Sequence, residues 1–132
     1  MRIIGGKYRG AILANVGKGD ISEQLRPTAD RVRENIFNLL INGGYGDLVE
    51  QAFVLDAFAG TGALGFEALS RGASCVLFID DGAKACSLIR ENINILSVQK
   101  YAKLSKRDVT KYIKNDEIKS VSYTHLTLPT KA

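Results

Sequence analysis

The order of apolar and polar positions predicts an amphipathic helix in the first third of the chain. Apolar side chains recur at helical spacing along one face: Val32, Ile36, Leu39 and Leu40. Charged side chains occupy the positions between them and predict a solvent-facing side: Arg31, Arg33 and Glu34. Pro27 and Thr28 precede this run, and Thr28 is a suitable N-cap for the helix.

Further along the chain, short apolar runs alternate with helical patterns. Strands are predicted at residues 52–55, 75–79 and 101–104, and helices at residues 63–70, 83–96 and 109–114. The second of these helices has a continuous apolar side: Ala85, Leu88, Ile89, Ile93 and Leu96. Strands and helices in this order predict an α/β fold of the Rossmann-like type, a parallel sheet with right-handed crossovers and helices on both faces.

The chain begins with a segment that has a different pattern. The run "RIIGGKYRGAIL" at residues 2–13 has two short β-prone stretches around Gly5 and Gly6, which predicts a β-hairpin. Basic and aromatic side chains alternate in it: Arg2, Lys7, Tyr8 and Arg9. Two interpretations are open, because such a hairpin can contact phosphates and a base, or can cap the domain as a solvated hairpin.

Composition limits the class of protein. A chain of 132 residues with 45% hydrophobic and 24% charged residues corresponds to at most one ordinary globular domain. No apolar run has the length of a membrane span, and the start lacks the apolar core of a signal peptide. We therefore expect a cytoplasmic protein that has no membrane partner. Cys75 and Cys86 lack metal-ligand spacing, which predicts reduced thiols and no metal site.

Three glycines follow the first predicted strand of the sheet. Gly60, Gly62 and Gly65 match the G-x-G-x-x-G pattern of nucleotide-binding turns. Asp80 follows Gly60 by 20 residues at the end of the next strand, where a carboxylate can accept hydrogen bonds from ribose hydroxyls. The spacing therefore predicts a cofactor that contains adenosine, and it fits a dinucleotide and S-adenosylmethionine alike.

Two further acids bear on this choice. Asp56 ends the first strand, and we expect its carboxylate to face the mouth of the turn. A pyrophosphate would be repelled there, whereas the ammonium group of a methionine moiety would be attracted, so the charge favours S-adenosylmethionine. Asp108 follows the third strand, where it can accept a hydrogen bond from an adenine amino group or act as the N-cap of the next helix.

Four segments together resemble one family. "RIIGGKYRG", "LRPTADRVRENIFN", "LDAFAGTGALGFEALSRGA" and "FIDD" are similar to the RsmD-type methyltransferases, which modify the guanine N2 amino group of 16S ribosomal RNA. The resemblance is collinear and covers residues 1–118. It implies a class I methyltransferase fold, S-adenosylmethionine as cofactor and, for the intact protein, a monomer. The implied partner is 16S rRNA or an assembly intermediate of the small ribosomal subunit.

The resemblance also implies roles for individual residues. The family's cofactor loop falls on seven consecutive positions: Asp56, Ala57, Phe58, Ala59, Gly60, Thr61 and Gly62. Asp80 corresponds to the acid that binds ribose, Asp108 to the acid near adenine, and Arg26 and Thr28 to the segment that lines the cofactor site. The expected RNA contacts are basic or aromatic: Arg2, Lys7, Tyr8, Arg9 and Arg31.

One feature of the family is missing from this sequence. Amino methyltransferases carry Asp/Asn-Pro-Pro-Phe/Tyr after a fourth strand, because an exocyclic amine is a weak nucleophile whose hydrogens must be accepted as attack begins. The only prolines here are Pro27 and Pro129, so no catalytic residue can be named. The Ser- and Thr-rich ending predicts a chain truncated before this motif.

The expected organisation follows from these observations. Residues 1–24 would form the basic hairpin and loop, residues 25–118 a partial domain that binds S-adenosylmethionine, and residues 119–132 a tail outside the fold. The first strand would then have an unpaired apolar edge, which is a site of aggregation. Two rival functions remain open: an NAD(P)-binding oxidoreductase, and a non-catalytic RNA-binding fragment.

Overall fold

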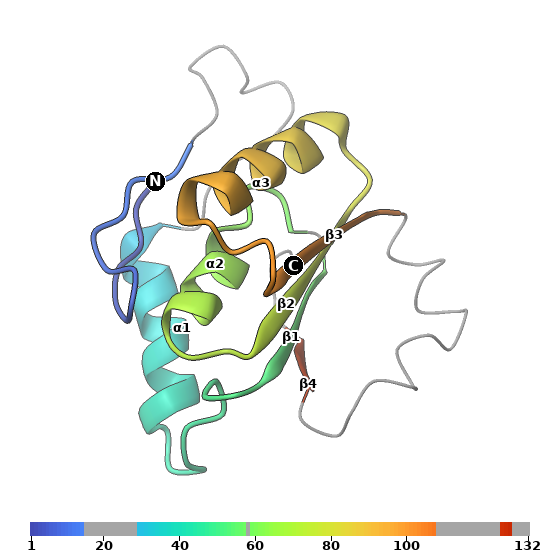
Figure 1. Ribbon diagram of the computed structural model, residues 1–132. Coiled ribbons are helices and arrows are strands. Elements are labelled where there is room, and N and C mark those ends of the chain that lie inside the picture. Colours follow the sequence, from blue (N-terminus) through green and yellow to red (C-terminus); the bar gives the residue numbers. More distant parts are fainter. Residues whose placement is uncertain (15–28, 58, 108–124, 128–132) are drawn as a thin grey trace.

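The computed structural model describes residues 1–14, 29–57, 59–107 and 125–127. Four strands form one parallel sheet (Figure 1): β1 (Phe53–Ala57), β2 (Cys75–Asp80), β3 (Ala102–Lys106) and β4 (His125–Thr127). Their order across the sheet is β3-β2-β1-β4. The three strands predicted from the sequence are thus confirmed, each with bounds that differ by two residues or fewer, and their parallel pairing is confirmed as well.

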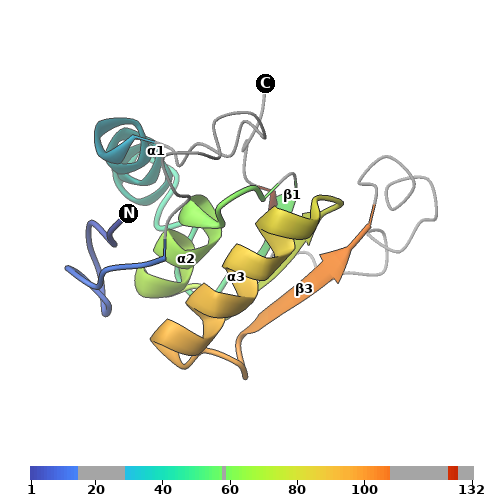
Figure 2. The same ribbon diagram turned by 90° about the horizontal axis from the view of Figure 1, so that it is seen from above.

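Two helices connect these strands as the sequence predicts. They are α2 (Ala63–Ser70) and α3 (Ala83–Leu96), and both have the predicted bounds. The predicted apolar side of α3 is buried along its whole length. Both helices lie on the same face of the sheet (Figure 2), so the expectation of helices on both faces is wrong for the described residues. The reason is geometric, because β1, β2 and β3 follow one another in one direction and right-handed crossovers then place both helices on one side.

Helix α1 (Asp30–Asn42) packs outside α2 and buries a face that the sequence did not predict. Its buried side chains are Arg33 and Phe37, whereas Val32 and Leu39 are 49% and 70% exposed. The assignment of Arg33 to the solvent-facing side is therefore wrong. Arg33 is buried because it pairs with a buried carboxylate of α2, which is described below. The N-cap is Ala29, and Thr28 lies outside the described residues.

The N-terminal segment folds back on itself in antiparallel fashion. Arg2 and Ile12 form a β-bridge, and the buried Ile3 and Leu13 anchor the segment in the core. The predicted hairpin is thus confirmed in its direction. Its turn runs through residues 5–10, and a tight turn at the two adjacent glycines is not formed. Instead, the Lys7 N–H donates to a carbonyl at the end of α2, 2.7 Å away, which docks the segment on that helix.

Strand β4 contradicts the expectation that β1 has an unpaired edge. Residues 125–127 pair in parallel with Phe53, Val54 and Leu55. These three residues of the expected tail therefore belong to the sheet, and β1 is an inner strand over this length. The helix expected at residues 109–114 lies outside the described residues. Among the described helices, none is long and apolar enough to cross a membrane.

Candidate functional site at the glycine turn

The turn between β1 and α2 depends on glycines for its shape. Gly60 and Gly62 have positive φ values of 59° and 81°, a left-handed conformation that favours glycine. Gly62 is the N-cap of α2, and a Cβ at this position would come within 2.7 Å of the Phe66 ring and 3.2 Å of Ile89. The glycines thus allow a tight turn directly at the carboxyl edge of the sheet, where ligands of open α/β sheets bind.

The third glycine is required by close packing between α2 and the sheet. A Cβ on Gly65 would overlap the ring of Phe78 and lie 2.9 Å from the carboxylate Oδ2 of Asp56. The Gly65 N–H donates to that same oxygen over 3.1 Å. Gly65 therefore brings the first turn of the helix against the end of β1, which is the role that the third glycine has in nucleotide-binding turns.

Asp80 holds the turn from the neighbouring strand. Its Oδ2 accepts a hydrogen bond from the Gly60 N–H over 2.9 Å, and its Oδ1 accepts one from the Gly82 N–H over 2.8 Å. The residue is half-buried at the end of β2. An ionised carboxylate has about four acceptor positions, so about two remain after these bonds. This geometry fits a carboxylate that also accepts from two hydroxyl groups of a ligand.

Asp56 does not face the mouth of the turn. Its side chain is fully buried, and its Oδ1 has no hydrogen-bond partner among the described residues. Burial raises the pKa of the Asp56 carboxyl well above its ordinary value; the hydrogen bond from Gly65 opposes the rise, and the negative charge of Asp80 adds to it. The expectation of an outward-facing anion at this position is wrong, so Asp56 supplies no charge at the turn's surface that would choose between cofactors.

The other predicted cofactor residues divide into two groups. Ala57 at the end of β1 and Ala59 and Thr61 in the turn are buried, and the Thr61 hydroxyl accepts from the Ala63 N–H over 3.4 Å. Four of the predicted residues lie outside the described residues: Arg26, Thr28, Phe58 and Asp108. The structure therefore brings Gly60, Gly62, Asp80 and the buried Asp56 together, as the sequence predicts. Direct contact of any of these residues with a cofactor stays a prediction.

The predicted RNA contacts lie at the opposite end of α2. This helix of eight residues is about 12 Å long, and the N-terminal segment binds its last residue. Arg9 and Arg31 are exposed, and Arg2 forms an exposed ion pair with Asp30. The Lys7 ammonium lies 5.5 Å from the centre of the Tyr8 ring. Three of the basic side chains, those of Arg2, Lys7 and Arg9, thus come from one exposed segment, and the contact of all these residues with RNA stays a prediction.

A cluster of charges under this surface was missed by the sequence analysis. Glu67 is fully buried in α2, and its carboxylate accepts from Arg33 over 3.1 Å and from Arg71 over 2.8 Å. It also accepts from the backbone N–H groups of Ile4 and Gly5, over 2.9 and 3.0 Å. Two signals could have revealed it. One is a glutamate within the apolar run "GFEAL", and the other is the spacing of Arg33 and Phe37, which places both side chains on one face of the helix.

Comparison with solved structures identifies the class of fold to which the sheet and the glycine turn belong. The described sheet and its glycine turn define a Rossmann-like fold, and similar solved structures show that it is of the class I methyltransferase type. The Escherichia coli protein yhhF, a candidate methyltransferase, superposes with a TM-score of 0.70 at 33% identity, over 86% of this chain and 55% of that one. The hypothetical protein TTHA0928 from Thermus thermophilus does so with a TM-score of 0.70 at 27% identity, over 90% of this chain and 62% of that one.

The family itself is shown by a match along nearly the whole sequence. The model of the family described as "Conserved hypothetical protein 95" matches residues 1–128, and the chain belongs to this family. Two relatives bear the name Ribosomal RNA small subunit methyltransferase D. The protein from Haemophilus influenzae is 42% identical over 96 residues, which are 73% of this chain and 45% of the relative. The protein from Escherichia coli K12 is 46% identical over 91 residues, which are 68% and 41%.

These matches confirm the resemblance to RsmD-type methyltransferases and extend it. The family match runs ten residues beyond the end of the resemblance recognised in the sequence, and it includes β4. The chain spans about half the length of the curated relatives that it matches, between 41% and 54% for three of them.

Proposed function

We propose that this chain is the cofactor-binding part of an S-adenosylmethionine-dependent rRNA methyltransferase. The observation that carries the proposal is the Asp80 carboxylate, which is fixed to the turn through Gly60 while about two of its acceptor positions remain for ribose hydroxyls. The family and the names of its relatives support methyl transfer to rRNA. The finer target, the N2 amino group of a guanine in 16S rRNA, rests on the resemblance of the sequence.

The residues of the turn fit the proposed cofactor. Gly60, Thr61 and Gly62 would approach it closely through their backbone, because no Cβ at the glycines obstructs the turn. Asp80 would bind its ribose, and by resemblance Asp108 would accept from its adenine. When bound, S-adenosylmethionine supplies an electrophilic methyl group on a positively charged sulfur. The role of this part of the chain would then be to orient the cofactor and to exclude water from it.

The rival oxidoreductase would use the same glycines and the same acid. Because Asp56 is buried, the choice between the cofactors no longer rests on its charge. The family favours the methyltransferase, since the relatives at 42% and 46% identity are named for that activity. A protein that acts on rRNA would work in the cytoplasm, in agreement with the expectation from the sequence. The non-catalytic RNA-binding fragment differs from the proposal in needing no cofactor at all.

Calorimetry separates these functions. The 132-residue protein is titrated with S-adenosylhomocysteine and, separately, with NADH. We expect saturable binding of S-adenosylhomocysteine and none of NADH. Binding of NADH alone would establish the oxidoreductase, and a folded protein that binds neither ligand while retaining RNA would establish the RNA-binding fragment.

Methyl transfer itself needs a group that accepts hydrogens from the guanine amine. The printed sequence contains no Asp/Asn-Pro-Pro-Phe/Tyr tetrad, because its prolines are Pro27 and Pro129 alone. We therefore expect the 132-residue chain to bind cofactor without transferring methyl. A radiolabelled-methyl assay on 16S RNA and on small subunits measures this. Turnover by this chain would mean that another group activates the amine.

A further inference from the structure

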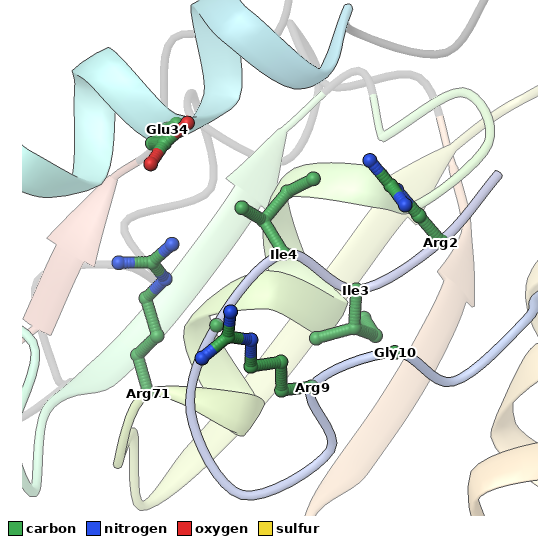
Figure 3. Close-up of a pocket in the computed structure, with 8 residues that line it drawn as sticks. Arg2, Ile3, Ile4, Arg9, Gly10, Glu34 and Arg71 are labelled. Carbon is green, nitrogen blue, oxygen red and sulfur yellow. The ribbon is translucent and has the colours of Figure 1, made fainter.

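A pocket of about 440 Å³ lies where the N-terminal segment meets α1 and the end of α2. Three arginines and one glutamate contribute to its wall (Figure 3): Arg2, Arg9, Arg71 and Glu34. The remaining lining residues are uncharged, so the wall itself has a net charge of +2; two of its arginines are also paired with carboxylates outside the lining, Arg2 with Asp30 and Arg71 with Glu67. The pocket is separated from the glycine turn by the length of α2.

Arg71 is held in place at this pocket. Its Nε donates to Glu67 over 2.8 Å, and its guanidinium lies 5.3 Å from the centre of the Phe37 ring. The backbone of the N-terminal segment packs directly on it, because a Cβ on Gly5 would be 2.9 Å from its Nη2. These contacts fix the guanidinium before any ligand arrives. A fixed guanidinium loses little entropy on binding and presents a planar pair of donors that matches phosphate geometry.

Arg9 supplies a second guanidinium on the same side. It comes from the turn of the N-terminal segment, is exposed, and points toward the region where the guanidinium of Arg71 lies (Figure 3). No ion pair of Arg9 is formed within the described residues. The two guanidiniums therefore converge on one space from two different segments, with donors left for a ligand.

Glu34 limits which anion this space can take. It lines the pocket from α1, and it is in no ion pair within the part of the chain that the structure describes. A carboxylate beside two guanidiniums repels an anion with two charges more than an anion with one. A phosphodiester group within an RNA strand has one negative charge, whereas the dianion of inorganic phosphate, which is present beside the monoanion at neutral pH, has two.

We propose that this pocket binds a phosphodiester group of an RNA strand, with Arg9 and Arg71 as the contacts and Glu34 as the group that disfavours phosphate dianions. The proposal rests on the proposed function for its RNA substrate, and it adds Arg71, Glu34 and a defined place to the basic residues predicted from the sequence. Because the pocket lies one helix length from the glycine turn, it would anchor the strand away from the reacting base.

The test compares the removal of a charge inside the pocket with the removal of a charge far from it. A labelled single-stranded RNA oligonucleotide is titrated into the 132-residue protein and into the variants Arg9→Ala and Lys100→Ala. Lys100 is exposed, lies outside the N-terminal segment and does not line the pocket. We expect Arg9→Ala to weaken binding about tenfold, as for one lost charge-assisted hydrogen bond, and to lower the salt slope by roughly 0.7. Lys100→Ala should weaken binding by less than about twofold, as for a screened surface charge. Equal losses in the two variants would overturn the proposal.

A second measurement tests the role of Glu34. Inorganic phosphate is used to displace the RNA at constant ionic strength from the unmodified protein and from Glu34→Gln. We expect phosphate to compete at least about twofold better against the variant, because a repulsive charge is removed. No change would overturn the assignment of Glu34. The same samples are also titrated with S-adenosylhomocysteine. If the cofactor analogue binds but the two alanine variants lose RNA affinity equally, only the pocket proposal is contradicted. If the unmodified protein does not bind the analogue, the proposed function is contradicted.

Discussion

Arg33 and Glu67 form an ion pair of 3.1 Å although their side chains are only 1% and 0% exposed. The carboxylate of Glu67 also accepts from two backbone N–H groups of the N-terminal segment and from Arg71. One buried carboxylate thus joins α1, α2 and the N-terminal segment. Removing two charges from water costs several kcal/mol per ion, and this cost is offset only when the remaining acceptor and donor positions are satisfied.

Removing the charge of Glu67 should strongly destabilise the protein. We expect Glu67→Gln to lower the free energy of unfolding by about 3–5 kcal/mol, because it removes the buried counter-charge of the Arg33 guanidinium, whose ion pair with the more exposed Asp30 remains. Urea denaturation measures the change. The matched control is Arg2→Ala, which breaks an exposed pair with Asp30 and should cost less than about 1 kcal/mol. Similar losses in the two variants would contradict the argument that burial sets the cost.

Asp80 should be required for cofactor affinity. Asp80→Asn removes the charge and one of the acceptors that hold Gly60 or Gly82, and we expect it to weaken binding of S-adenosylhomocysteine by about 1–3 kcal/mol. Calorimetry measures the affinity, and thermal denaturation checks that the variant is folded. Asp81→Asn is the control, because it removes the same charge from the adjacent, exposed position. A folded Asp80→Asn variant with unchanged affinity would remove Asp80 from the site.

Asp56 should make stability depend on pH. Its pKa is raised in the folded protein, chiefly by burial, so the folded state keeps this proton to higher pH than the unfolded state. The resulting stability is fully present below the ordinary pKa of an aspartate, about 3.9, and is lost as the pH rises through the raised value. Asp56→Asn cannot titrate. We therefore expect its stability, relative to the unmodified protein, to increase as the pH rises above about 4 and through the raised pKa.

Denaturation of both proteins across this pH range measures the difference between them, in which the other titrating groups largely cancel. The hydrogen bond from Gly65 is retained in the variant if the amide oxygen takes the place of Oδ2. A difference that is constant with pH would show that Asp56 has the same pKa in the folded and unfolded states.

The sequence predicted those elements whose local pattern and final environment agree. The bounds of α2 and α3 were correct because an apolar run or an apolar stripe ends there at glycine or at a polar turn. The glycine turn was recognised because its conformation allows few other residues at Gly60 and Gly62. Asp80 was placed correctly at the end of its strand, since strand ends and helix starts are local features.

The errors concern contacts between segments that are distant in the sequence. Arg33 was assigned to solvent because its charge is costly to bury, and only the fold brings Glu67 to it from 34 residues away. Asp56 was assigned to the mouth of the turn because the direction of a side chain at a strand end depends on the packing of the next helix. In the structure, Gly65 lets that helix cover the carboxylate completely.

The pairing of β4 with β1 gives the last prediction, since the sequence alone assigned residues 125–127 to a tail outside the fold. Successive N–H groups of a strand point in opposite directions, so one of the two variants Leu126→Pro and Thr127→Pro must remove a donor aimed at β1. We expect at least one of them to lower the free energy of unfolding by about 1–3 kcal/mol, the cost of an unsatisfied backbone group, and to increase aggregation by uncovering the edge of β1.

Leu126→Ala and Thr127→Ala are the controls, because they keep the backbone N–H. Urea denaturation and light scattering measure the two effects. If each proline variant behaves like its alanine control, β4 does not pair with β1 in solution, and these residues lie outside the fold after all.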